Sequence, residues 1–196
     1  MIAQEKTNIS EADNKNRFGL DLGLYYTPIL NKDLTAGNFD LRYYWSKRFC
    51  AGFSIYGGSK ITSDEFGYDV KEPRLDYAGI SILSEVNIVN THRVRVNLSV
   101  NNGFAQIELV DRSEKIKTGS KNIFLEYHAK SITYNSCYLL EPGLDISFLL
   151  RKENNMYLTL KSKYRLAYGD TPLGSNALMS GYHIGLSLSF LFPKLD

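Results

Sequence analysis

The last extended run of the chain, Gly181–Phe192, alternates between two kinds of side chain with a period of two. One face carries Tyr182, Ile184, Leu186, Leu188, Phe190 and Phe192, and the other carries His183, Gly185, Ser187 and Ser189. This is the side-chain repeat of a β-strand, whereas a helix repeats every 3.6 residues. The run therefore predicts a strand with one apolar face, and a length of about 9 to 11 residues suits a strand that crosses a hydrocarbon layer.

Seven earlier stretches repeat this alternation. The eight predicted strands are residues 18–26, 38–45, 49–56, 78–88, 94–101, 140–150, 158–166 and 181–192. The connections 46–48, 90–92 and 151–155 are short, and the connections 30–37, 57–74, 102–135 and 170–179 are long. Within 102–135, residues 104–110 and 123–134 look extended enough to prolong a hairpin. The pattern predicts an all-β, antiparallel, up-and-down transmembrane barrel of about eight strands, with short turns at one pole and long loops at the other.

Composition is consistent with this architecture. A chain of 196 residues suits one domain, and a net charge of +2 gives no basic field for nucleic acid. We expect residues 1–16 to form a polar N-terminal arm in the periplasm, with a signal-peptide remnant at 1–3. Residues 17–192 would form the barrel, and 193–196 a short periplasmic extension.

The same alternation would also fit a soluble, ligand-carrying barrel with an ordinary solvated charged face. Two observations favour a membrane barrel. The apolar face supplies roughly forty large side chains, more than the interior of an eight-stranded barrel holds. The polar face is rich in glycine between long charged residues, and glycine in a narrow barrel makes room for a neighbouring lysine or arginine. We therefore expect apolar side chains to face lipid.

Charges on the polar face balance. The predicted lumen network contains Asp21, Asp40, Glu85, Glu141, Asp145, Arg42, Arg95, Lys161, Lys163 and Arg165. In a hairpin of strands 140–150 and 158–166 centred on residue 153, Asp145 faces Lys161 and Glu141 faces Arg165. In a hairpin of strands 78–88 and 94–101 centred on residue 90, Glu85 faces Arg95. Facing opposite charges are favourable, and desolvated charges persist only when they are paired. The sequence predicts a salt-bridged lumen.

With these features the chain resembles the small Gram-negative outer-membrane barrels of the OmpA and OmpX type over residues 17–192. The end of the chain, with Tyr182, Phe190 and Phe192, looks like the C-terminal signal that the barrel-assembly machinery recognises, although residues 193–196 follow the final aromatic residue where the family usually ends. The resemblance implies an integral outer-membrane location. It also implies outer-membrane lipid, lipopolysaccharide and the assembly machinery as partners, with a larger outer-membrane complex as a further one.

Candidate chemical groups are few. His92 and His128 lack a second histidine or cysteine at metal spacing, so we expect no metal, cofactor or catalytic residue. His183 is the candidate for the competing function, a lipid A-modifying barrel enzyme. Cys50 and Cys137 fall at opposite ends of the barrel and are expected to be free thiols. Tyr26, Tyr43, Trp45, Tyr164 and Tyr182 are expected to form aromatic girdles at the two membrane interfaces.

The function predicted from these features is non-enzymatic. Eight strands leave no diffusion channel, so a minor small-solute pore is only a second alternative. We expect a structural, surface-binding or accessory subunit of an outer-membrane assembly that acts through its outer loops, especially 102–135. The candidate partner surface comprises Phe104, Ile107, Phe124, Tyr127 and Tyr134, although packing of these residues within the loop itself is the alternative.

Overall fold

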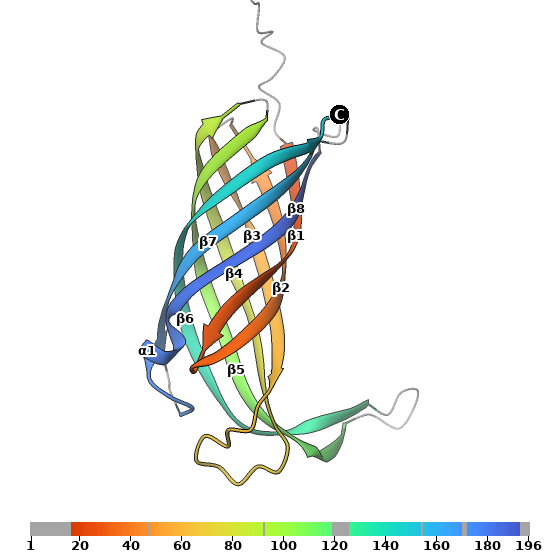
Figure 1. Cartoon of the computed structure of the whole chain (residues 1–196), viewed down its shortest axis with the longest axis vertical. Helices are drawn as coiled ribbons and strands as arrows, with labels where there is room; N and C mark the ends of the chain where they lie inside the picture. The colour runs from red at the N-terminus through yellow and green to blue at the C-terminus, as the bar shows by residue number, and fades with distance from the viewer. Residues whose placement is uncertain are drawn as a thin grey trace, which may run out of the picture.

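A computed structural model of the chain describes residues 17–46, 48–91, 93–118, 126–153, 155–169 and 172–192. Eight antiparallel strands follow each other around a closed barrel, and β1 pairs with β8 to close it (Figure 1). The strands are β1 Arg17–Ile29, β2 Lys32–Tyr44, β3 Phe49–Ile61, β4 Pro73–Asn90, β5 Val94–Thr118, β6 Glu126–Arg151, β7 Met156–Gly169 and β8 Gly181–Phe192. A short helix, α1 Asn176–Met179, precedes β8. The predicted eight-stranded up-and-down topology is confirmed. The expected arm, 1–16, and extension, 193–196, lie outside the described residues.

One predicted loop is wrong. Residues 30–37 were expected to be irregular, but β2 begins at Lys32 and pairs with β1 from the Ile29–Lys32 pair onward. Leu30 and Asn31 form a two-residue turn with φ of 52° and 59°. Two consecutive positive φ values belong to a type I′ hairpin turn, whose twist matches that of the strands. Because this turn contains no glycine, it could not be recognised from the residue types alone.

The barrel wall is uneven at the loop pole. β5 and β6 have 25 and 26 residues, whereas β1, β2 and β3 have 13 each. The expected extension at 104–110 lies in β5 and pairs with β6, while part of 123–134 lies outside the described residues. Beyond the barrel, the β5–β6 hairpin bends away from the axis (Figure 1), following register shifts at Leu109/Val110 and Asp111/Lys115. Bulges of this kind bend a strand and re-aim it.

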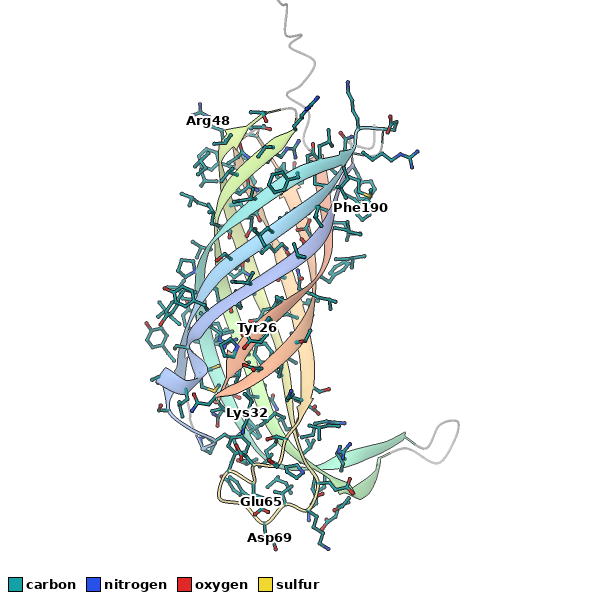
Figure 2. All side chains as sticks on the ribbon, viewed as in Figure 1. Tyr26, Lys32, Arg48, Glu65, Asp69 and Phe190 are labelled. Carbon is teal, nitrogen blue, oxygen red and sulfur yellow. The ribbon has the colours of Figure 1, made fainter. Side chains whose placement is uncertain are left out.

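The apolar side chains of the strands face outward. Leu22 is 49% exposed, Ile82 57% and Leu186 55%, whereas Asp145 is fully buried and Lys161 is 7% exposed. This arrangement leaves a belt of exposed apolar side chains around the barrel, visible as sticks projecting from the ribbon in Figure 2. Such an inversion is stable in hydrocarbon and costly in water. In the described part of the chain, no helix is long and apolar enough to span a membrane.

A cluster of buried apolar side chains, which was not predicted from the sequence, fills the barrel at the loop pole. Its strand residues include Leu75, Tyr77, Ile107, Leu109 and Leu139, and it is completed by Val70, Leu173 and Met179 from the connecting segments. All of these side chains are buried. The interior is therefore layered, with a charged region toward the short turns and an apolar plug, defined by this cluster, under the outer loops.

Candidate functional site in the barrel interior

The charged region toward the short turns forms a layer across the barrel interior, called the charged layer below, and Arg42 is at its centre. Its guanidinium lies 2.7 Å from Asp21, 2.9 Å from Glu85, 3.4 Å from Asp40 and 3.7 Å from Asp145, measured between nitrogen and carboxylate oxygen. All five residues are at most 3% exposed. Each of these residues belongs to the alternate positions of its strand whose side chains point to the barrel axis. The alternation in β1, β2, β4 and β6 therefore brings four carboxylates to one cation.

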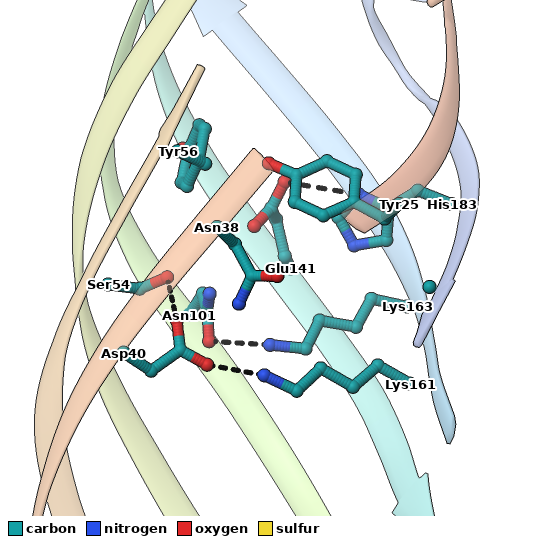
Figure 3. A pocket seen from close by; sticks show the side chains of 11 residues that line it. Tyr25, Asn38, Asp40, Ser54, Tyr56, Asn101, Glu141, Lys161, Lys163 and His183 are labelled. Carbon is teal, nitrogen blue, oxygen red and sulfur yellow. Dashed lines mark hydrogen bonds and ion pairs between the residues drawn. The ribbon is translucent and has the colours of Figure 1, made fainter. Parts of the chain in front are cut away.

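Lys161 on β7 is the second cation of this layer. Its Nζ lies 3.0 Å from Asp21 and 2.5 Å from Asp40. Ser54 donates a 2.6 Å hydrogen bond to the other oxygen of Asp40, and Lys163 donates to Asn101 over 2.9 Å (Figure 3). Buried charges persist only with paired and hydrogen-bonded partners, and this layer supplies both.

The predicted cross-strand partners are only partly as expected. Asp145 does face Lys161 in the ladder, although the ammonium reaches across to Asp21 and Asp40. The expected Glu85–Arg95 pair is wrong, because Glu85 faces Ser99 and Arg95 faces Asn90. The turn is centred two residues later than expected, where Thr91 accepts a 3.0 Å hydrogen bond from the Val94 amide.

Arg95 is separate from the ion-paired layer. Its guanidinium lies over the ring of Tyr157, 4.5 Å from the ring centre. Among the described residues it has no ion-pair partner. This cation–π contact replaces the predicted pairing with Glu85.

Glu141 and His183 lie on the side of the charged layer that faces the loop pole. Together with Tyr25, Lys161 and Lys163 they line a cavity of about 20 Å³ (Figure 3). The Glu141 Oε1 to His183 Nδ1 distance is 3.9 Å, and within the described residues neither atom has a hydrogen-bond partner. The His183 ring packs against Tyr25 with ring centres 5.1 Å apart.

Arg165 connects the charged layer to the plug instead of pairing with Glu141. It donates hydrogen bonds to the Met179 carbonyl and the Pro28 carbonyl, each over 2.7 Å, and to Thr27 Oγ1 over 2.8 Å. Its guanidinium also faces the Tyr77 ring at 5.6 Å. The expected Glu141–Arg165 ion pair is therefore not formed, because backbone carbonyls at the barrel mouth take up the guanidinium donors.

Asp111 holds the connection 62–72 against the barrel rim. Its carboxylate accepts hydrogen bonds from the amides of Lys71, Glu72 and Ser113 over 3.1, 3.3 and 2.9 Å. Asp111 lies seven residues beyond the outward-facing Phe104 on β5, outside the apolar belt. The hydrogen bonds from the Ser113 hydroxyl and from these amides lower the pKa of Asp111 to about 2.

Some of the inward glycines make room for tyrosine side chains. A Cβ added at Gly79 would lie 2.2 Å from the Tyr56 ring, and one added at Gly185 would lie 2.5 Å from Tyr25. Space for a lysine, as predicted, is found at Gly143, where the added atom would lie 2.3 Å from Lys163 Cγ. The inward tyrosines were not recognised as site residues, although their parity places them inside.

The predicted girdle residues all face outward. Exposure is 49% for Tyr26, 37% for Tyr43, 50% for Trp45, 37% for Tyr164 and 69% for Tyr182. Tyr43 and Trp45 lie near the short turns, and the other three lie near the loop pole. Tyr164 and Tyr182 are ladder partners whose rings meet edge to face with centres 4.7 Å apart. At the end of the chain, Phe192 is exposed and Phe190 is half-buried on the same outer face.

The predicted partner surface is divided by the structure. Phe104 and Tyr134 are 66% and 55% exposed. Ile107 is 2% exposed because its parity directs it into the plug, so its assignment to an outer surface is wrong. Phe124 lies outside the described residues, and Tyr127 is described only by its place in the β5–β6 ladder.

Cysteine and metal chemistry add no site within the described residues. Cys50 and Cys137 are buried free thiols, as predicted. No group of three or more metal-ligating side chains is present in the described ranges, and His92 lies outside them. The backbone of His128 belongs to β6.

No family model and no curated protein matches the sequence. Neisserial surface protein A superposes with a TM-score of 0.55 at 9% identity, covering 91% of this chain and 97% of that one. The N-terminal β-barrel domain of Pseudomonas aeruginosa OprF gives a TM-score of 0.48 at 14% identity, covering 91% and 98%. Ail of Yersinia pestis gives 0.47 at 10%, covering 91% and 97%.

The likeness to Neisserial surface protein A concerns the fold, and it agrees with the closed eight-stranded topology. The apolar belt and the buried charged layer add an independent physical argument, because this combination is stable in a bilayer. The resemblance predicted from the sequence is thereby confirmed at the level of the fold. The chain has the fold of the small eight-stranded outer-membrane β-barrels.

Proposed function

We propose that this barrel is a non-enzymatic surface-binding or accessory protein, and that the β5–β6 hairpin carries its binding surface. The observation that carries the proposal is the length of this hairpin. Its strands have 25 and 26 residues, about twice as many as the strands on the opposite side of the barrel. An extension beyond the length that crosses a bilayer adds nothing to membrane anchoring. Its ordered strands therefore favour a role outside the membrane.

The hairpin is stiffened where it leaves the barrel. Lys130 and Glu114 form an ion pair across its two strands at 2.7 Å. Arg112 pairs with Glu72 at 3.3 Å, and the Arg112 amide donates to the Glu72 carbonyl over 3.0 Å. These contacts support a hairpin held in a fixed direction, which reduces the entropy lost on binding.

The interior supports neither alternative function. The Arg42 layer and the apolar plug fill the barrel at two levels, which leaves little room for a solute path. His183 is 7% exposed and lies against Tyr25 inside the barrel. A lipid-modifying enzyme needs its base within reach of a nucleophile and of the lipid, so the inward position of His183 favours the non-enzymatic role.

The test removes the hairpin and keeps the barrel. Residues 112–129 are replaced by Asn-Gly, a two-residue turn that suits the ladder pair Asp111 and Lys130. Membranes are solubilised mildly, and stoichiometric companions of the tagged protein are identified. We expect a companion with the wild type that is lost with the shortened variant. The matched control is Asn155→Gly at the opposite pole, where a φ of 45° suits glycine.

Two outcomes contradict the proposal. One is a companion that the shortened variant retains. The other is a change in the mass of lipid A between cells with the wild type and cells with His183→Ala. The second result would establish the enzymatic alternative.

A further inference from the structure

Cations gather on the pole that carries the short turns. Arg48 lies between β2 and β3, and Arg93 precedes β5. Arg151 ends β6, and Lys152 lies in the turn that follows. All four side chains are exposed, and Arg48 is labelled at the rim in Figure 2. In the described part of these turns the carboxylate is that of Glu153, 3.4 Å from Arg151. Four cations against one carboxylate give this rim a positive potential.

The loop pole has the opposite balance. Among residues 32–33, 60–76, 108–114 and 129–130, whose side chains the structure describes, nine are acidic and six are basic. Among the described side chains, the two poles of the barrel therefore differ in charge balance. A general excess of basic residues does not explain the cationic rim.

The rim lies directly at the edge of the apolar belt. Trp45 and Phe49, on either side of Arg48, are 50% and 45% exposed. Leu150, next to Arg151, is 51% exposed. A cation at the end of such a strand reaches the headgroup layer while its aliphatic stem covers apolar surface.

We propose that this cationic rim, defined by Arg48, Arg93, Arg151 and Lys152, binds the phosphates of acidic phospholipids in the leaflet that borders the short turns. Arginine forms charge-assisted, often bidentate hydrogen bonds to phosphate oxygens. Each turn takes its own headgroup, because the three turns join different pairs of strands around the circumference. Acidic phospholipid collects around this pole and fixes the depth of the barrel in the membrane.

The arrangement fits lipid better than a protein partner. A protein interface requires one contiguous surface, usually with an apolar centre and a polar rim. Here the cations are distributed over three separate turns, and the apolar neighbours of each turn belong to the belt that faces acyl chains. Mobile headgroups occupy such separated sites independently.

Trp45 provides a built-in reporter, since it is the single tryptophan of the chain and lies three residues from Arg48. The full-length protein is refolded into phosphatidylcholine vesicles that contain acyl-brominated phosphatidylglycerol or, in parallel, acyl-brominated phosphatidylcholine at equal mole fraction. Bromine quenches tryptophan on contact. A basic residue near an anionic surface enriches acidic lipid up to about fivefold, so we expect brominated phosphatidylglycerol to quench about twice as strongly at low salt.

The variant with all four rim residues changed to glutamine should quench equally with both lipids. The matched control changes Lys60, Lys71 and Arg74 to glutamine at the loop pole and should keep the wild-type ratio. Insertion of each variant is checked by the mobility of unheated samples on gels. Equal quenching by both lipids in the wild type overturns the proposal. It is also overturned if the rim variant keeps the wild-type ratio of quenching by phosphatidylglycerol to quenching by phosphatidylcholine. Either result leaves the hairpin proposal unaffected, because the hairpin lies at the opposite pole.

Discussion

Replacing Arg42 by methionine tests the charged layer most directly. Methionine keeps much of the side-chain volume but removes the cation that contacts Asp21, Glu85, Asp40 and Asp145. Lys161 would then remain to pair with Asp21 and Asp40. Removing one partner of a buried ion pair costs about 3–5 kcal/mol, because it leaves an uncompensated buried charge. We expect a loss in this range in the free energy of unfolding.

The assay is urea unfolding of the protein in phospholipid vesicles, followed by the fluorescence of Trp45 and by gel mobility. The matched control is Arg95→Met, which removes an inward arginine held by Tyr157 outside the ion-paired layer. Loss of that cation–π contact should cost about 0.5–2 kcal/mol. Adding Glu85→Gln to Arg42→Met removes one uncompensated carboxylate and should restore part of the stability.

A cost of less than about 1 kcal/mol for Arg42→Met, the typical value of an exposed ion pair, would contradict a buried network around Arg42. So would a double variant in which Glu85→Gln adds its own full cost to that of Arg42→Met. Such additivity would mean that the two side chains do not interact.

Three further predictions concern the plug and the barrel wall. Arg165→Met should loosen the mouth and raise the rate of maleimide labelling at Cys137 about tenfold or more, with Cys50 at the other end unchanged; equal labelling would contradict the role of Arg165. The pKa of Asp111, lowered to about 2, implies that the connection 62–72 is held above pH 4 and released as pH falls through 2. Amide hydrogen exchange in this connection should show the release, and Asp111→Asn should abolish its pH dependence. Gly103→Val should prevent barrel formation on gels, because even its Cβ would lie 2.1 Å from the Ile80 carbonyl oxygen, whereas the outward-facing Val100→Ala should fold normally.

Much of the fold could be predicted from alternation alone. The run 181–192 gave the last strand to the residue, and the other strands were found with correct faces and shorter ends. Ends were missed where the apolar side chains turn inward, as in β2, which begins at Lys32 and not at 38 and buries Leu34 and Ala36 in the plug. A hydrogen-bonded ladder extends wherever both strands are available, whatever the polarity of their side chains.

The site was predicted less completely. Parity identified the residues of the charged layer, because each strand has only two faces. Parity could not show that Arg42 contacts four carboxylates from different strands, or that Arg165 reaches the Met179 carbonyl. Those contacts depend on the heights of residues on non-neighbouring strands, which the stagger around the barrel determines.

Within the predicted strands, the sequence by itself determined which side chains face lipid and which face inward, since a period of two leaves no other choice once the barrel closes. The tertiary structure decided how the inward side chains pair and that an apolar plug closes the outer end. The physical reason is the distance along the chain between the residues that interact. Alternation is local along one strand, whereas the Arg42 layer and the plug join residues more than a hundred positions apart, such as Asp40 with Lys161 and Pro28 with Arg165.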